Sequence, residues 1–310
     1  MISAFDKPRR GIRFFNAVLA LVFVLNIGCD RRREGTIMMV DGRYEPVIAA
    51  TESIGIASPD GLLFQDGRIF IADEGGSACR AWNPQLSGDS AALVTFCDES
   101  SGIRSPEDLV RDADGNIYFS DDDAGGVWHL DAAGRCQRLT DPSSGLAETE
   151  AIALTPDGDL LVGDAIGHRV CRVTKDGNVS DFLGPEHHIN KPESMVFGDD
   201  GELYIADNRD RVLYRWTASD GLRRLISQQK LFSPESICYS KGAVYITDSS
   251  SGRLSRYSQT NGLQTIAIFG GSMRSIQGIT IDDQDNIYLS VQADLKRKQG
   301  YIIALKRTPG

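Results

Sequence analysis

Acidic side chains recur at one position of an internal repeat, where their carboxylates could bind a cation or transfer protons. Six segments open with similar phrases, among them SPDGL at 58, SPEDL at 105, KPESM at 191 and SPESI at 233. One position of the phrase holds, in order, Asp60, Glu107, Glu150, Glu193, Glu235 and Gln277. Carboxylate oxygens are preferred ligands of calcium, and carboxyl groups also act as general acids or bases.

The residues around these acids predict short β-strands in repeated units. Each opening phrase is followed by a polar turn, a second strand that mostly ends in Asp, and further strands. The acidic positions are 47, 43, 43, 42 and 42 residues apart. A period of about 40–45 residues with four strands is typical of β-propeller blades. Because residues 50–310 lack helical periodicity, the sequence predicts an all-β fold, a six-bladed β-propeller of four-stranded blades.

The last blade needs a strand from elsewhere in the chain. The sixth repeat ends after three strands, whereas residues 43–52 (RYEPVIAATE) precede the first repeat and have the character of a strand. We expect this N-terminal strand to complete the sixth blade and to leave no open sheet edge there. The predicted propeller therefore spans residues 43–310, as a monomeric body.

In a propeller the first strand of each blade lines the central channel, so the repeated acids should converge near one mouth of the axis. Alternate residues of a strand share a face. We therefore expect each acid to lie on the same face as the apolar residue two positions later, which is Leu62, Leu109, Ile152, Met195, Ile237 or Ile279.

Converging carboxylates repel one another. Two unit charges about 6 Å apart cost roughly 3 kcal/mol at an effective dielectric constant of about 20. Raised pKa values, a bound cation or inserted basic side chains would each relieve this repulsion. We expect a divalent cation, with calcium as first choice because zinc prefers His or Cys. Its expected ligands are Asp60, Glu107, Glu150, Glu193 and Glu235.

The alternative is a metal-free ring in which the acids pair with basic residues from the loops before their strands. Such loops contain Arg104, Lys191, Lys230 and Arg274.

Other repeated polar residues have a structural interpretation. The second strands end in Asp, whose short side chain can accept hydrogen bonds from backbone N–H groups at a turn. The aspartates in question are Asp73, Asp121, Asp164, Asp207 and Asp248. We assign a structural role to the His168–Arg169 pair as well.

The N-terminus predicts export. Lys7, Arg9, Arg10 and Arg13 precede a short apolar run at 14–28, which fits a signal peptide better than a membrane span. Gly28 is followed by Cys29, and this junction resembles the bacterial lipoprotein signal. The resemblance implies a signal peptide at 1–28, a lipid on Cys29 and a tether at 29–42. We expect anchoring on the periplasmic side. Asp30 after Cys29 resembles the enterobacterial signal for retention, which implies the inner membrane; the alternative is secretion.

Net charge and cysteines limit the remaining possibilities. The formal net charge of −10 argues against nucleic acid as a partner. Cys79 and Cys97 fall on neighbouring predicted strands, where they either form a disulfide in an oxidising compartment or remain two buried thiols. The pairing of Cys136 and Cys171 stays open, and Cys238 makes the number of cysteines in the body odd.

The repeat phrases SPEDLVRDADGNIYFSD and PESMVFGDDGELYIAD resemble gluconolactonase/regucalcin-type and NHL-repeat propellers. The resemblance covers roughly 44–310 and implies one divalent metal held by inner-strand residues. By position the ligands are Asp60, Glu150, Glu193 and Glu235, with Glu where the family typically has Asn. Glu235 matches the position of the family's proposed base.

The resemblance implies an exported lactone hydrolase that uses the metal and Glu235, with His188 at the same mouth as a second candidate for proton transfer. The alternative is a non-catalytic, NHL-like propeller that binds a protein or a small molecule at its mouth. Fold alone does not decide between these functions.

Overall fold

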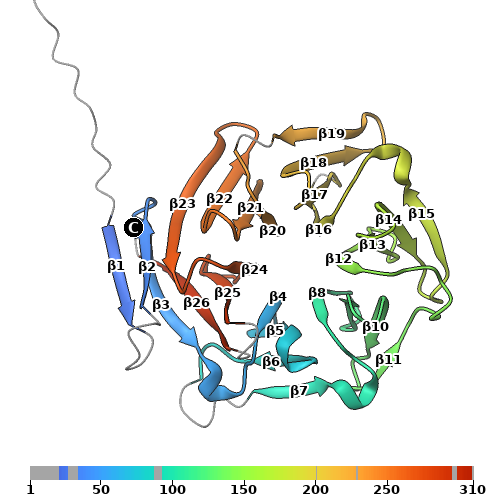
Figure 1. The fold of residues 1–310 in the computed structure, drawn as a ribbon, viewed down its shortest axis with the longest axis horizontal. Coiled ribbons are helices and arrows are strands. Elements are labelled where there is room, and N and C mark those ends of the chain that lie inside the picture. Colours follow the sequence, from blue (N-terminus) through green and yellow to red (C-terminus); the bar gives the residue numbers. More distant parts are fainter. Residues whose placement is uncertain are drawn as a thin grey trace, which may run out of the picture.

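The computed structural model describes residues 21–26, 34–86, 93–199, 201–227, 230–294 and 299–308. These residues form six antiparallel sheets around a central axis, as Figure 1 shows. The sheets are the blades of a six-bladed all-β propeller, which confirms the predicted fold class. Within the described residues, the structure contains no helix with the length and apolar character that a membrane span requires.

Blades one to three each consist of four consecutive strands. Blade one contains β4 (Pro59–Gln65), β5 (Arg68–Asp73), β6 (Ala78–Trp82) and β7 (Val94–Cys97). Blade two contains β8 (Pro106–Arg111), β9 (Ile117–Asp121), β10 (Gly126–Leu130) and β11 (Cys136–Arg138). Blade three contains β12 (Thr149–Leu154), β13 (Leu160–Asp164), β14 (Arg169–Val173) and β15 (Val179–Leu183).

Blade four repeats this pattern, whereas blades five and six also include strands from the N-terminal part of the chain. Blade four contains β16 (Pro192–Phe197), β17 (Leu203–Asp207), β18 (Val212–Thr217) and β19 (Gly221–Ile226). Blade five contains β20 (Pro234–Ser240), β21 (Ala243–Asp248), β22 (Arg253–Ser258) and β23 (Gly262–Gly271). Blade six contains β24 (Ile276–Ile281), β25 (Ile287–Asp294) and β26 (Gln299–Arg307). Short 3-10 helices occur at Glu52–Ile54, Glu74–Gly76, Glu99–Ser101 and Pro185–His187.

The N-terminal strands pair with the outer edges of blades five and six. β3 (Tyr44–Ala50) pairs with β26 and supplies the fourth strand of blade six, as predicted. β2 (Glu34–Met39), which lies in the segment expected to be a tether, pairs instead with β23 as an extra outer strand of blade five. β1 (Leu21–Asn26) pairs with β2 in turn. Residues 1–20 and 27–28 of the predicted signal peptide lie outside the described residues, as does Cys29.

The hydrophobic core lies between neighbouring blades and forms six clusters. The apolar residue two positions after each repeated acid belongs to one of these clusters. The cluster between blades five and six also contains Ile37, Met39 and Tyr44, which are 0%, 2% and 6% exposed. The N-terminal strands therefore contribute to the core as well as to the sheets.

A β-bulge interrupts every inner strand beside the repeated acidic position. In blade four, for example, Pro192 pairs with Asp207 and Ser194 with Ala206, so Glu193 is the extra residue. A bulge redirects the side chains of its strand. The expectation that each acid shares a face with the apolar residue two positions later was therefore wrong: the apolar residues pack between blades, whereas the acids point to the axis.

The aspartates that end the second strands are buried and accept hydrogen bonds from backbone N–H groups, which confirms their structural role. Asp207, for example, accepts hydrogen bonds from the N–H groups of Asn190 at 2.7 Å and Asp210 at 2.8 Å. It thereby fixes the loop that enters β16. Arg169 has the structural role expected of it, because it forms an ion pair with Asp164.

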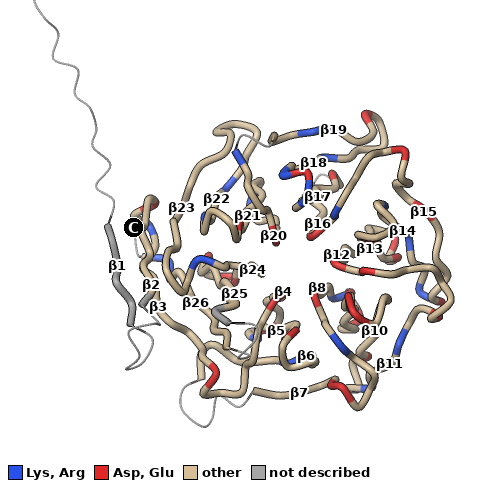
Figure 2. Tube along the Cα trace, viewed as in Figure 1, with Lys and Arg blue, Asp and Glu red and all other residues tan. Residues whose placement is uncertain are grey.

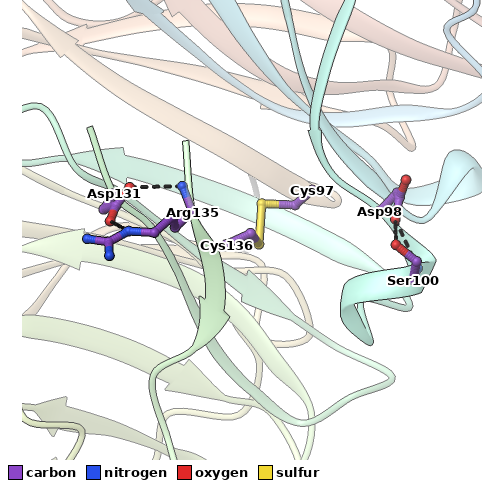
Figure 3. Close-up of a disulfide and its surroundings, with 6 residues drawn as sticks. All are labelled: Cys97, Asp98, Ser100, Asp131, Arg135 and Cys136. Carbon is purple, nitrogen blue, oxygen red and sulfur yellow. Dashed lines mark hydrogen bonds and ion pairs between the residues drawn. A yellow bond between two sulfur atoms is a disulfide. The ribbon is translucent and has the colours of Figure 1, made fainter. Parts of the chain in front are cut away.

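Cys97 forms a disulfide with Cys136 rather than with Cys79, the pairing that the sequence analysis considered. Cys79 and Cys97 are register partners on β6 and β7, but Cys97 is bonded to Cys136 on β11 of blade two, with 5.8 Å between the Cα atoms. Figure 3 shows this bridge. All three side chains contact the cluster between blades one and two, so Cys97 can reach across the blade boundary. Cys79 stays a buried thiol, and burial raises its pKa to about 12, which makes it a poor nucleophile towards the disulfide.

Candidate functional site

The repeated acids converge on the propeller axis. Figure 2 shows acidic positions on the inner strands around the centre of the ring. A small cavity there is lined by carboxyl groups from five blades, and the space open to the centre of a water molecule is about 10 Å³. That is room for about one water molecule or one ion. The acids that line it are Asp60, Glu107, Glu150, Glu193 and Glu235, as predicted, together with Asp108.

Within the described residues, one basic side chain forms ion pairs with this acidic ring. Lys191 enters from the loop before β16, and its Nζ lies 2.8 Å from Oε1 of Glu150 and 3.1 Å from Oε2 of Glu193. The other candidates do not pair with the ring: Arg104 pairs with Glu99, Arg274 donates to the carbonyl of Ser250, and Lys230 is exposed. In the described part of the chain, the salt-bridged alternative therefore holds for one pair of acids.

Burial and mutual repulsion dominate the electrostatics of the ring. Burial raises the pKa of Asp60 and Glu107 well above their usual range, and neighbouring carboxylates raise both further. Burial also raises the pKa of Glu150 to about 7, although Lys191 opposes that shift. The pKa of Glu193 is raised by burial and by Glu150 and Glu235. Burial thus disfavours the ionised form of each carboxyl group of the ring, and Lys191 partly offsets this for Glu150 and Glu193.

Hydroxyl and amide donors hold the carboxyl groups in place. Glu235 accepts hydrogen bonds through Oε1 from the hydroxyls of Ser233, at 3.1 Å, and Ser249. Gln292 donates to Oδ2 of Asp60 at 3.0 Å. Glu193 differs, because its Oε2 is buried and receives no directed hydrogen bond although Lys191 Nζ lies 3.1 Å away. The carboxyl group of Glu193 interacts with Lys191 through both oxygens and with the neighbouring Glu235.

Asp108 is a site residue that the sequence analysis missed. It follows Glu107 in the bulge of β8, and at the same position the other blades have Gly61, Ala151, Ser194, Ser236 and Gly278. Space explains these small residues: a Cβ on Gly61 would lie 2.2 Å from the carbonyl oxygen of Glu107. Asp108 accepts hydrogen bonds from the N–H of Leu109 at 2.9 Å and the hydroxyl of Ser194 at 3.4 Å. Its charge among otherwise small residues was the signal in the sequence.

We expect Asp108→Asn to make the free energy of unfolding less dependent on pH. Burial raises the pKa of Asp108 to about 7, so the folded protein holds this proton more tightly than the unfolded chain. A raised carboxyl pKa means that stability falls as pH increases from about 4 to about 7. Asparagine resembles the protonated acid. The advantage of the variant over wild type should therefore grow by roughly 2–3 kcal/mol between pH 5 and pH 8.

Urea denaturation at pH 5 and pH 8 measures this difference. Asp114→Asn, at an exposed turn of the same blade, is the matched control. An Asp108→Asn variant that loses the same stability as wild type between the two pH values would show that Asp108 is not the titrating group.

A second group of acids adjoins the ring. Within the described residues, the group of three potential metal ligands whose donor atoms all lie within 4.8 Å of one another consists of Asp122, Glu148 and Glu150. Burial raises the pKa of Asp122 to about 6, and Glu148 adds to the effect. The predicted ligand Glu150 thus joins the ring to two acids that were not singled out. Their signal was local: Asp122 follows a strand-ending Asp, and Glu148 precedes Glu150 by two residues.

Two other candidates lie away from the cavity. His188 is exposed just after the 3-10 helix Pro185–His187 and does not line the axial cavity. Gln277, at the repeated position of blade six, donates to the hydroxyl of Ser275 at 2.9 Å. The acids of the axial cavity therefore come from blades one to five.

Fold and site together define a six-bladed β-propeller with a buried acidic centre on its axis. The chain belongs to the SMP-30/Gluconolactonase/LRE-like family, whose model matches residues 106–299. The protein is thus related to gluconolactonases. Metal dependence is typical of this family, and the acidic cluster offers suitable oxygen donors. No curated protein matches the chain in a sequence search.

Solved structures share the fold at low sequence identity. A gluconolactonase from Xanthomonas campestris is 13% identical, with a TM-score of 0.64 over 87% of this chain and 90% of that one. A virginiamycin B lyase from Staphylococcus aureus is 17% identical, with a TM-score of 0.61 over 79% and 81%. A chain of a nidogen/laminin complex is 15% identical, with a TM-score of 0.58 over 69% and 85%. The fold is therefore common to hydrolases, lyases and a binding protein.

Proposed function

We propose that this protein is a metal-dependent hydrolase of small lactones, with its reaction centre at the acidic ring. The observation that carries the proposal is the convergence of five repeated carboxyl groups on a cavity of ionic size, with one lysine to compensate them. A structural core would not require this arrangement, because buried carboxylates destabilise a fold unless they are paired.

The donor set fits a hard divalent cation such as calcium. Every acid of the ring offers oxygen, calcium accepts several oxygens in adaptable geometry, and Glu193 Oε2 is a buried oxygen without a directed hydrogen bond. Glu150 and Glu193 are the central candidates, with Asp60, Glu107 and Glu235 around them. When bound, the cation would act as a Lewis acid that polarises the lactone carbonyl and lowers the pKa of water.

Glu235 is suited to be the general base of this reaction. Burial raises its pKa, and the hydroxyls of Ser249 and Ser233 lower it again in part. Both serines donate to Oε1 and so fix the carboxylate, while Lys191 and a hydrogen bond with Glu193 also lower its pKa. A carboxylate with a raised pKa is a stronger base than one in water. Lys191 has a different role: it neutralises Glu150 and Glu193 and sets the net charge of the ring.

We expect Glu235→Gln to lower kcat for lactone hydrolysis by about a hundredfold, because general-base catalysis typically contributes 10²–10⁴-fold. The assay follows acid release from δ-gluconolactone with calcium, magnesium or manganese, and with chelator. Glu45→Gln, on the exposed side of β3, is the matched control. Wild-type activity that survives chelation, or a Glu235→Gln variant with full activity, would contradict the assigned roles.

A non-catalytic binding function is the second candidate. Lys191 already occupies part of the ring, and the axial cavity admits a species of the size of water rather than a lactone. These features favour a structural or electrostatic role for the ring beneath a binding surface. The hydrolysis assay separates the two functions, since a binding propeller shows no metal-dependent turnover.

We propose further that the protein is exported and carries a lipid on Cys29. The basic residues, apolar run and Gly28–Cys29 junction support this, and the Cys97–Cys136 disulfide is typical of oxidising compartments. Mass spectrometry of the membrane fraction should find an acylated N-terminal Cys29. Replacing Cys29 with Ser should release the protein from the membrane. An uncleaved N-terminus, or extraction of wild type without detergent, would contradict the proposal.

A further inference from the structure

A second cavity opens beside the acidic ring, between blades three and four. We call it the mouth pocket. It is built by the loops that enter β12 and β16 and by the β13–β14 and β17–β18 turns, and its volume is about 200 Å³. Pockets for drug-sized ligands have about 300–1,000 Å³, so this one suits a small metabolite. Its lining includes Glu148, Ile166, His168, Asn190, Lys191 and Arg209.

Two side chains connect the mouth pocket with the acidic ring. Lys191 lines the pocket and forms ion pairs with Glu150 and Glu193 of the ring. Glu148 also lines the pocket, and one of its carboxylate oxygens lies within 4.8 Å of one of Glu150. A ligand in the pocket would therefore lie next to the ring.

His168 lines this pocket and has one ring nitrogen that the protein holds in place. Its Nδ1 lies 2.8 Å from the carbonyl oxygen of Asn190. A carbonyl oxygen only accepts, so Nδ1 carries the proton and the neutral ring keeps its lone pair on Nε2. The backbone also holds His168, which has a left-handed φ of 51° in the β13–β14 turn. A ligand hydroxyl can donate to this fixed acceptor.

The positive charge of Arg209 has no partner among the described residues. Its side chain is exposed at the β17–β18 turn, and within the described part of the chain it has neither an ion pair nor a hydrogen bond. The charge of Lys191, by contrast, is shared by two ring carboxylates. A guanidinium group binds a carboxylate through two parallel hydrogen bonds. An anionic group of a ligand is the natural partner of Arg209.

We propose that the mouth pocket binds a small hydroxy acid, with the carboxylate on Arg209 and a hydroxyl donating to His168 Nε2. This inference rests on the proposed function in one respect. If the ring hydrolyses lactones, a carboxylate site beside it means that its substrates are lactones with an additional carboxylate rather than neutral lactones. The exposed Ile166, at 64%, forms an apolar side of the pocket that would contact the carbon chain of the ligand.

Binding of sodium D-gluconate, measured by isothermal titration calorimetry in chelator, tests the pocket without metal at the ring. Sorbitol has an alcohol in place of the carboxylate and should bind at least tenfold more weakly. Arg209→Gln should weaken gluconate binding at least tenfold and abolish its dependence on salt, because the charge pair is lost. His168→Asn should weaken gluconate binding too, while asparagine tolerates the left-handed backbone.

Arg211→Gln is the matched control, since Arg211 is an exposed arginine of the same turn that does not line the pocket. It should bind gluconate as wild type does. The proposal is overturned if wild type does not bind gluconate, if sorbitol binds equally well, or if neither Arg209→Gln nor His168→Asn changes the affinity. If gluconate binding depends on Arg209 but the protein has no lactonase activity, the pocket proposal is supported and only the proposed hydrolysis is refuted.

Discussion

Deleting residues 34–52 is expected to leave a chain that no longer folds to a stable monomer. β3 supplies the fourth strand of blade six, and its loss exposes the whole edge of β26 from Ile302 to Arg307. An exposed edge of this kind pairs with other chains. The deletion also removes Ile37, Met39 and Tyr44 from the core between blades five and six. Loss of sheet and core together predicts aggregation rather than a lower melting temperature.

A shorter deletion separates the two strands. The protein that begins at Arg43 lacks β2 but keeps β3, so the ring of blades stays closed. It should fold, but it loses the buried side chains of Ile37 and Met39. Because full burial of one such side chain stabilises by about 1.5–3 kcal/mol, its free energy of unfolding should be about 3–6 kcal/mol lower than that of the protein beginning at Glu34. Size-exclusion chromatography and urea denaturation measure both effects. If the chain from residue 53 onward melts like the longer ones, closure by β3 is wrong.

Calcium at a thousandfold excess over its Kd is expected to raise the free energy of unfolding of the wild type by about 4.1 kcal/mol, provided that it binds only the folded protein. Glu193→Gln should remove much of that gain, because an amide oxygen is a poorer ligand for calcium than a carboxylate. In chelator at pH 8 the same substitution should raise stability. Glu193 has a raised pKa, so its ionised form destabilises the folded state as pH increases above the unfolded value of about 4.3.

This reversal of sign distinguishes a cation site from a salt-bridged ring. If Glu193 serves mainly to hold Lys191, its replacement weakens the protein with and without calcium. Thermal unfolding of wild type, Glu193→Gln and the exposed control Glu45→Gln, each with calcium and with chelator, gives the comparison. The absence of a calcium effect in wild type, with a variant that is weaker in both conditions, would favour the binding propeller over the hydrolase.

The repeat made most of the fold predictable. A period near 43 residues with Asp at the end of the second strand determined the number of blades, and the missing strand after Lys306 predicted closure by residues 43–52, where the structure has β3 at Tyr44–Ala50. The extra strand β2 was not predictable in the same way. EGTIMM at 34–39 lies outside the repeat, and its strand character depends on the partner β23, which a local pattern does not reveal.

The site was predictable in position but not in detail. Repetition alone placed Asp60, Glu107, Glu150, Glu193 and Glu235 on the axis. The bulges beside them were not visible, because a single extra residue leaves the spacing of the repeat unchanged. Asp108 was missed for this reason: it follows Glu107 in the bulge, and its hydrogen bond to Ser194 of blade four joins residues 86 positions apart. Contacts of this kind arise from the closed ring and not from any one repeat.

The disulfide illustrates the same difference. Cys79 and Cys97 are neighbours within a blade, which a repeat pattern shows. The bond to Cys136 crosses between blades, and it requires the outer strands β7 and β11 to approach each other. That approach depends on how blades pack side by side.

The extra strand β2 also limits how far the body can stand from a membrane. If the lipid is on Cys29, as we propose, only Asp30, Arg31, Arg32 and Arg33 separate the anchor from the first residue of β2. Fully extended, that linker reaches at most about 18 Å. The rim at blade five would rest against the lipid headgroups, to which three consecutive arginines are attracted where those are anionic. The channel would then open sideways, and a ligand would reach it by diffusing along the membrane surface.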